Sequence, residues 1–223
     1  MNHKVARLSV IVSQHWKVSE DHIAPYLAPY YRASFLYGGD FETLCWTSLN
    51  EQIVRFEAMI RVYNFAGKSI IDAGCGRADF LNFLTEADIT PISYIGIEAI
   101  RPLADRARSK LFSGLTSIQT DFVASGFPRD VSPDVVTFSG SLNTLKTNSL
   151  KRTLLSALYT ARHAVVFNFL SSPAAAGAPW LAWHAKDEVF SLFEGVSCEL
   201  SFADGYLDGD MTVVVKHTSP SPK

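Results

Sequence analysis

The stretch "SIIDAGCGRADF", residues 69–80, decides how the rest of the chain is interpreted. An apolar run ends at Asp72, Gly74 and Gly76 follow closely, and a run with helical spacing begins. Glycine allows a backbone to turn sharply and to pass close to another group. This stretch therefore predicts a buried strand, a loop that approaches a ligand, and a helix.

Strands and helices alternate on both sides of this stretch. Such alternation predicts an α/β fold with a doubly wound, mostly parallel sheet, helices on both faces, and an antiparallel last strand. Five strands and a closing pair make seven. We expect strands at 68–73, 92–98, 117–122, 134–140 and 163–170 with two more within 198–217, and helices at 47–63, 78–87, 101–112, 148–162 and 186–195.

Local signals mark the helices of the amino-terminal part. Ser48 and Glu51 have the spacing of a capping box, so a helix is expected to begin there. Residues 18–36 are rich in Tyr and Ala. We expect them to be helical in pieces broken at Pro25 and Pro29, because proline lacks the backbone N–H.

Composition limits the class of protein. The chain has 223 residues, 48% of them apolar, and a net charge of −2, which suits one soluble domain and gives no general attraction to nucleic acid or anionic membranes. Cys45, Cys75 and Cys198 are widely spaced. They form no disulfide or zinc pattern, which favours a cytoplasmic protein without a metal site. No run approaches the roughly 20 apolar residues of a membrane helix, and residues 218–223 are expected to be disordered.

Acidic residues occur at the ends of three successive predicted strands. They are Asp72, Glu98 and Asp121, and Phe122 follows the third. Carboxyl ends of neighbouring parallel strands meet at one edge of the sheet, where ligands bind. S-adenosylmethionine offers cationic groups, two ribose hydroxyls and an adenine amino group to such acids, and an aromatic ring can cover the adenine. The pattern therefore indicates this cofactor.

A dinucleotide is the alternative ligand for a loop with two glycines. Its fingerprint needs a third small residue three positions after the second glycine, and Asp79 stands there. A pyrophosphate at the start of the helix would lie close to both Asp72 and Asp79. An NAD(P)-dependent oxidoreductase is therefore a weaker interpretation.

Four segments together resemble the class I S-adenosylmethionine-dependent methyltransferases. They are "IIDAGCGRADFLNFL", "YIGIE", "QTDF" and "DVVTFSGSLN", and they cover most of residues 68–170. The resemblance implies the Rossmann-like methyltransferase fold and an enzyme that uses S-adenosyl-L-methionine and releases S-adenosyl-L-homocysteine.

The resemblance also implies which residues bind the cofactor. The family often has a third glycine where this chain has Ala78, so the geometry of the loop is the point of departure. The implied set is Asp72, Gly74, Cys75 and Gly76 beneath the methionine, Glu98 with Ala99 at the ribose, Asp121 and Phe122 beside the adenine, and Ser139 and Gly140 along the cofactor.

The segment "GGDFETLCWTSLNEQIVRFEAM" resembles a lead-in found in some bacterial members of this family. On that pattern Trp46, Gln52 and Arg55 face the cofactor, and Arg55 pairs with the methionine carboxylate. Other interpretations stay open. Arg55 can be a surface residue paired with Glu51 four positions earlier, and Trp46 can be a core anchor.

The expected function is methyl transfer to a small organic acceptor, achieved mainly by positioning. Sequence elements of nucleic-acid methylases are absent, so a nucleic-acid acceptor is disfavoured. Residues 1–45 are expected to form a helical lid that, with loop 171–186, encloses the acceptor over a cofactor-binding domain at 46–217. A non-catalytic cofactor-binding protein remains an alternative. The aromatic lid residues are His15, Trp16, His22, Tyr26, Tyr30 and Tyr31.

Overall fold

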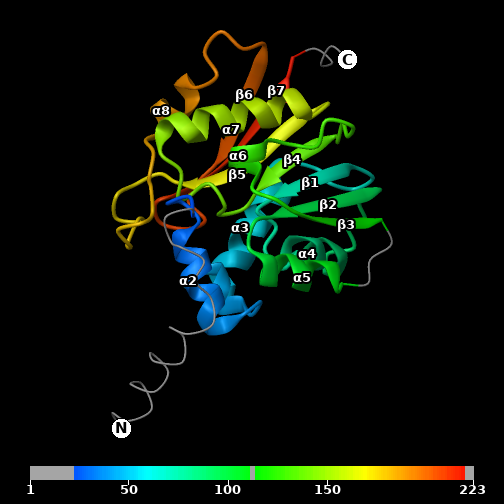
Figure 1. Cartoon of the computed structure of the whole chain (residues 1–223). Helices are drawn as coiled ribbons and strands as arrows, with labels where there is room; N and C mark the ends of the chain where they lie inside the picture. The colour runs from blue at the N-terminus through cyan, green and yellow to red at the C-terminus, as the bar shows by residue number, and fades with distance from the viewer. Residues whose placement is uncertain (1–22, 111–113, 219–223) are drawn as a thin grey trace, which may run out of the picture.

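A seven-stranded sheet with the order β3-β2-β1-β4-β5-β7-β6 forms the centre of the molecule (Figure 1). The structure is a computed structural model and describes residues 23–110 and 114–218. The strands are β1 (Ser69–Ala73), β2 (Ser93–Glu98), β3 (Leu115–Gln119), β4 (Val135–Phe138), β5 (Ala164–Leu170), β6 (Cys198–Ala203) and β7 (Asp210–His217).

Strands β1 to β5 pair in parallel, whereas β7 lies antiparallel between β5 and β6. This confirms the predicted fold class. The strand order reverses at β1, whose neighbours are β2 and β4. That reversal is the position at which doubly wound sheets bind ligands.

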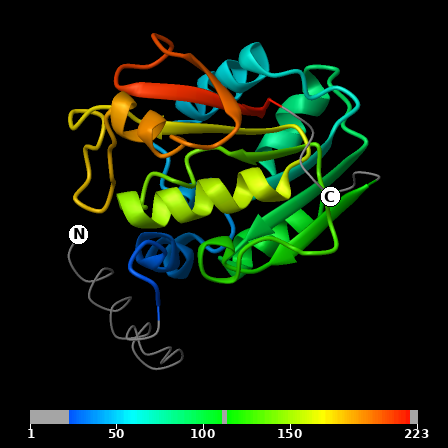
Figure 2. The same ribbon diagram turned by 90° about the horizontal axis from the view of Figure 1, so that it is seen from above.

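Helices cover both faces of the sheet, with α7 and α3 on opposite sides (Figure 2). Leu154 of α7 and Val189 of α8 belong to one buried cluster, and Met59 of α3 and Leu84 of α4 belong to the other. The helices are α2 (Ala28–Tyr37), α3 (Leu49–Val62), α4 (Asp79–Glu86), α5 (Arg101–Arg108), α6 (Phe122–Ser125), α7 (Thr147–Thr160) and α8 (Lys186–Ser191), with a 3-10 helix, η2 (Phe41–Leu44).

The central strands are mostly apolar because both of their faces are covered. In β5, Val165 and Phe167 join the cluster beneath α7, while Ala164 and Val166 join the cluster beneath α3. The sheet therefore has two separate cores, and polar residues are left for its carboxyl edge.

The start of α3 agrees with the sequence prediction, whereas the start of α2 differs from it. Ser48 caps α3, and its hydroxyl accepts a hydrogen bond from the Glu51 N–H at 3.2 Å. The expected break at Pro29 is wrong, because Pro29 lies in the first turn of α2, where a missing N–H has no cost. Residues 18–22 and 219–223 of the predicted helical and disordered segments lie outside the described residues.

The third strand ends earlier than predicted. β3 stops at Gln119, and Asp121 instead caps the short helix α6. Its Oδ1 accepts hydrogen bonds from the N–H groups of Val123 at 2.9 Å and Ala124 at 3.3 Å. Aspartate is a preferred N-cap, and this preference outweighs the extended conformation that the sequence suggested.

Candidate functional site

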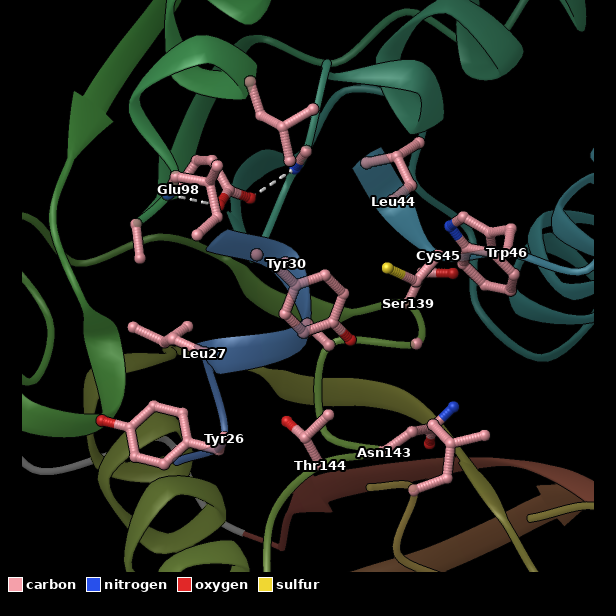
Figure 3. A pocket seen from close by; sticks show the side chains of 18 of the residues that line it. Tyr26, Leu27, Tyr30, Leu44, Cys45, Trp46, Glu98, Ser139, Asn143 and Thr144 are labelled. Atoms are coloured by element: carbon pink, nitrogen blue, oxygen red, sulfur yellow. Dashed lines mark hydrogen bonds between the residues drawn. The ribbon is translucent and has the colours of Figure 1, made fainter. Parts of the chain in front are cut away.

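A cavity opens at the carboxyl ends of β1, β2, β4 and β5 and extends beneath α2 (Figure 3). It brings together residues from loops that are far apart in the chain. The predicted cofactor residues that line it are Trp46, Arg55, Gly74, Gly76, Glu98, Ala99, Asp121, Phe122, Ser139 and Gly140.

The other predicted residues, Asp72, Cys75 and Gln52, line a smaller cavity next to the first. Its volume is about 20 Å³, and a single water needs roughly 10–15 Å³. The two cavities share the walls formed by Trp46 and Gly74. The Oε1 atom of Gln52 is buried without a hydrogen-bond partner among the described residues.

The glycine loop after β1 has a left-handed backbone. Gly74 has a φ of 76°, and a Cβ on it would lie 2.3 Å from the Cβ of Ser141. The loop therefore lies directly against the segment that follows β4. Ala78 also has a left-handed backbone, with a φ of 57°, at a cost of roughly 1–2 kcal/mol. Ala78 therefore adopts the left-handed conformation that glycine adopts easily at such a position.

Glu98, the last residue of β2, is buried and connects two loops. Its Oε2 accepts a hydrogen bond from the Gly76 N–H at 2.9 Å, and its Oε1 accepts one from the Ile100 N–H at 2.8 Å (Figure 3). Burial raises the pKa of this carboxyl to about 7. Each oxygen keeps a further lone pair for a ligand hydroxyl.

Asp72 is buried beneath the glycine loop and accepts hydrogen bonds from the hydroxyls of Tyr94 and Thr137. Burial raises its pKa to about 6. Cys75 is buried as well, and its sulfur would lie 2.7 Å from a Cβ on Gly96. Burial raises the pKa of the Cys75 thiol well above its usual value, so it packs against β2 as a neutral side chain.

Asp121 faces the cavity and is already in contact with the segment that leads into α2. Its Oδ2 accepts a hydrogen bond from the Tyr26 hydroxyl at 2.6 Å. Burial, together with this hydrogen bond, raises the pKa of the Tyr26 phenol. Phe122 packs on Phe138, with ring centroids 5.6 Å apart, and forms an apolar wall beside the carboxylate.

Trp46 and Arg55 form one unit at the opposite wall. The Arg55 guanidinium lies 4.8 Å from the centroid of the Trp46 ring, and its Nε donates to Asp210 Oδ2 at 2.6 Å. The Arg55–Glu51 distance is longer, at 3.6 Å. Arg55 is therefore a buried residue that lines the cavity, and its main partner is on β7. The Trp46 ring lies against Gly140, where a Cβ would approach it to 2.8 Å.

In the comparisons with known proteins, only solved structures match this chain. No family model matches the chain, and no curated protein does. Magnesium protoporphyrin IX methyltransferase from Synechocystis PCC 6803, with bound SAH (S-adenosylhomocysteine), has a TM-score of 0.66 and 12% identity over 87% of this chain and 99% of that one. The DhpI–SAH complex has a TM-score of 0.66 and 13% identity, and the match covers 89% of this chain and 97% of that one. An S-adenosylmethionine-dependent methyltransferase from Clostridium acetobutylicum has a TM-score of 0.59 and 11% identity over 85% and 99%.

The chain has the class I methyltransferase fold. At these identities the likeness concerns the fold, and it confirms the architecture that the sequence resemblance implied. Within residues 23–110 and 114–218 no helix has the length and apolar character needed to span a membrane. In the same part of the chain, no group of three or more His, Cys, Asp or Glu side chains is placed to hold a metal ion.

Two segments cover the cavity of this methyltransferase fold. The first is α2 with the turn before it, which contributes Tyr26 and Tyr30 but not Tyr31. The second is loop 171–185, which contributes Trp180 and Leu181. The rings of Tyr30 and Trp180 meet edge to face, with centroids 6.2 Å apart. His15, Trp16 and His22 of the predicted lid lie outside the described residues.

The sequence did not single out Asn143, one of the polar residues between β4 and α7. Asn143 lines the cavity, is 8% exposed, and its Oδ1 has no hydrogen-bond partner among the described residues. It is the last residue of the stretch "DVVTFSGSLN", which carried the resemblance, but it was given no role there. Its backbone oxygen accepts a hydrogen bond from the Ala182 N–H of loop 171–185, and no local pattern predicts that contact.

Proposed function

We propose that this protein transfers a methyl group from S-adenosylmethionine to a small organic acceptor. One observation carries the proposal: a single cavity contains Gly74 of the β1 loop, Glu98 at the end of β2, and Asp121 after β3. These groups follow the order of methionine, ribose and adenine in the cofactor. A glycine loop followed by two acids in that order suits a ligand that offers hydrogen-bond donors at its ribose and adenine.

In this proposal, Glu98 accepts hydrogen bonds from the ribose hydroxyls, and Asp121 accepts a hydrogen bond from the adenine amino group. Phe122, Ile100 and Leu103 also line the cavity, and such apolar side chains suit the faces of a flat base. The methionine part then lies over the glycine loop. Asp72 and the unpartnered Oε1 of Gln52, in the small adjoining cavity, attract the methionine ammonium directly or through one water.

Arg55 is the proposed partner of the methionine carboxylate. Its Nε is held by Asp210, and the guanidinium lies over Trp46. A guanidinium has five N–H donors, so binding Asp210 through Nε leaves donors for a ligand. This fixed arrangement supports a positioning role for Trp46 and Arg55 together.

The acceptor side supports catalysis by position more than by a base. Among the described residues no histidine lines the cavity, and burial raises the pKa of the Tyr26 and Tyr30 phenols, so both stay neutral. Holding the nucleophile in line with the sulfonium methyl, in a site closed to water, can supply much of the rate. The enclosing side chains of α2 and loop 171–185 serve that purpose.

A dinucleotide fits this cavity less well. A pyrophosphate at the start of α4 would meet Asp79, and it would lie near the buried Asp72 of β1 and near Glu98 of β2, which binds the Gly76 N–H. Asp79 already pairs with Arg77 and Lys110 at 3.2 Å and 3.1 Å, which neutralises the cations that a phosphate would need. A non-catalytic cofactor-binding protein would share every contact proposed above, and turnover separates it from an enzyme.

The test is calorimetric titration of the protein with S-adenosylmethionine, S-adenosylhomocysteine and NAD. We expect the first two to bind and NAD not to bind. Glu98→Gln should weaken S-adenosylhomocysteine binding by about tenfold or more, since lost charged hydrogen bonds cost roughly 1.5–3 kcal/mol. Glu199→Gln, an exposed change on β6, is the matched control. Binding of NAD alone would contradict the proposal.

Turnover is then measured as S-adenosylhomocysteine released from S-adenosylmethionine in the presence of a panel of small amines, phenols, alcohols and thiols. Release that depends on one acceptor supports the enzyme. Tight cofactor binding without release across the whole panel would favour the non-catalytic alternative.

A further inference from the structure

Asn143 lines the cavity, and its side-chain oxygen is a buried hydrogen-bond acceptor without a partner among the described residues. The residue is 8% exposed. A buried polar atom without a partner destabilises a protein by roughly 1–3 kcal/mol. A ligand that brings a donor to this atom would recover that free energy.

Asn143 lies on the part of the cavity that the proposed cofactor does not use. Figure 3 shows Asn143 and Thr144 on the other side of Tyr30 from Glu98. Both residues come from the segment between β4 and α7, and Leu170 at the end of β5 also lines the cavity. The groups assigned to ribose and adenine lie at the ends of β2 and β3, whereas Asn143 follows β4. We therefore place Asn143 on the acceptor side of the cavity.

The backbone holds Asn143 in place. Its carbonyl oxygen accepts a hydrogen bond from the Ala182 N–H at 2.7 Å, and its own N–H donates to the Gly140 oxygen at 3.3 Å. His184 Nε2 lies 2.9 Å from the oxygen of Leu145, two residues further on, and fixes the same loop a second time. The side chain therefore has a defined position from which to select a ligand.

The neighbouring walls are apolar and aromatic. Tyr30 and Trp180 meet edge to face, and Leu170 and Leu181 line the cavity with them. Flat rings and branched aliphatic side chains favour a flat apolar ligand. Against such walls, one unpaired amide oxygen is a strong source of specificity.

We infer that Asn143 determines acceptor specificity: its Oδ1 accepts a hydrogen bond from an N–H or O–H group on an acceptor with an aromatic or similarly flat apolar body. The inference rests on the proposed function and narrows its substrate class to phenols, arylamines and related compounds. Asn143 acts here through binding and positioning, and takes no proton from the acceptor.

The test compares probes that differ in the donor alone. 4-Ethylphenol and 4-ethylaniline carry a donor, and 4-ethylanisole has a methyl ether in its place. Binding to the protein saturated with S-adenosylhomocysteine is measured by ligand-observed NMR titration. We expect the donor probes to bind about tenfold more tightly than the ether, as one satisfied buried acceptor implies.

Two substitutions at Asn143 assign the effect to its oxygen. Asn143→Leu should reduce the preference to about one, whereas Asn143→Asp, which keeps acceptor oxygens and removes the donor nitrogen, should retain it. Asn148→Leu, an exposed change in α7, is the matched control. Unchanged S-adenosylhomocysteine affinity in each variant shows that the fold and the cofactor end are intact.

Three results would overturn the inference: equal affinity of wild-type protein for the donor and ether probes, a preference that survives Asn143→Leu, or a preference that reverses in Asn143→Asp. Absence of binding by all probes would overturn the aromatic class. The probes are also titrated without S-adenosylhomocysteine. If that cofactor product does not bind to wild-type protein, the proposed function fails, while the second titration still decides the role of Asn143.

Discussion

The hydroxyl of Tyr26 donates a 2.6 Å hydrogen bond to the carboxylate of Asp121, which lies 95 positions further along the chain. Tyr26 precedes α2, and Asp121 caps α6 with its other oxygen. One carboxylate therefore fixes both a helix start and the helix that covers the cavity.

Removing that hydroxyl should loosen α2. Tyr26→Phe keeps the ring and removes a hydrogen bond to a carboxylate, worth roughly 1.5–3 kcal/mol. We expect faster amide hydrogen exchange in residues 28–37, measured by mass spectrometry, with the exchange of β1 and β4 unchanged. Tyr31→Phe, which does not alter the cavity wall, is the control. Equal exchange in both variants would show that the contact does not hold the helix.

Stability should depend on pH through Glu98. Burial raises its pKa from 4.5 to about 7, so between these values the folded state keeps a proton that the unfolded state has released. The free energy of unfolding should therefore fall as pH rises from about 4.5 to 7, by up to roughly 1.4 kcal/mol per pH unit, and level off above. Asp72, with its pKa raised to about 6, adds to the lower part of this window.

Urea unfolding at pH 5, 6, 7 and 8 measures this dependence in wild-type protein and in Glu98→Gln. The variant should keep only the slope that Asp72 contributes below about pH 6. A stability that rises between pH 6 and 7 in wild-type protein would mean that Glu98 is ionised in the folded state well below neutral pH.

Gly140 should be needed for the shape of the cavity as well as for its backbone. It has a φ of 72°, and a Cβ would approach the Trp46 ring to 2.8 Å, whereas Gly67 has a φ of 66° and nothing within 4 Å. Both Gly140→Ala and Gly67→Ala should cost about 1–2 kcal/mol for the left-handed backbone. Calorimetry should find weaker S-adenosylhomocysteine binding in Gly140→Ala alone; equal affinity would remove Trp46 from the binding wall.

The ion pair between Arg55 and Asp210 should make a large contribution to stability. Both side chains are buried, so Arg55→Met leaves an unpaired acid and should cost about 3–5 kcal/mol. In a double-mutant cycle with Asp210→Asn, the combined loss should be smaller than the sum of the single losses. Additive losses in urea unfolding would mean that the two residues act independently.

Sequence reasoning placed two of the acidic residues correctly at the carboxyl edge of the sheet, because strand ends carry local signals. An apolar run that stops at Asp72 or Glu98 marks the carboxyl edge of a buried strand, and both residues lie there. Asp121 was assigned to the correct edge but to the wrong element, since its preference for capping a helix competes with a strand of similar composition.

The walls formed by Arg55, Trp180 and Asn143 were predicted less completely because their contacts are long-range. Whether Arg55 is a surface residue or a wall residue depends on Asp210, 155 positions away. Trp180 belongs to the loop that was expected to enclose the acceptor, yet its contact with Tyr30 comes from folding alone. The backbone oxygen of Asn143 accepts a hydrogen bond from Ala182 of the same loop. Periodicity and spacing describe neighbours within one element and carry no information about such pairs.

The placement of β7 has a consequence for synthesis of the chain. It is the final strand of the described sequence, yet it lies between β5 and β6 and supplies the carboxylate of Asp210 to Arg55. While a ribosome is still making β7, β5 presents an open edge and Arg55 has not yet met this counter-ion. The nascent protein therefore passes through an interval in which β1 to β6 are made but the sheet is incomplete, and the unpaired edge of β5 is open to non-native contacts.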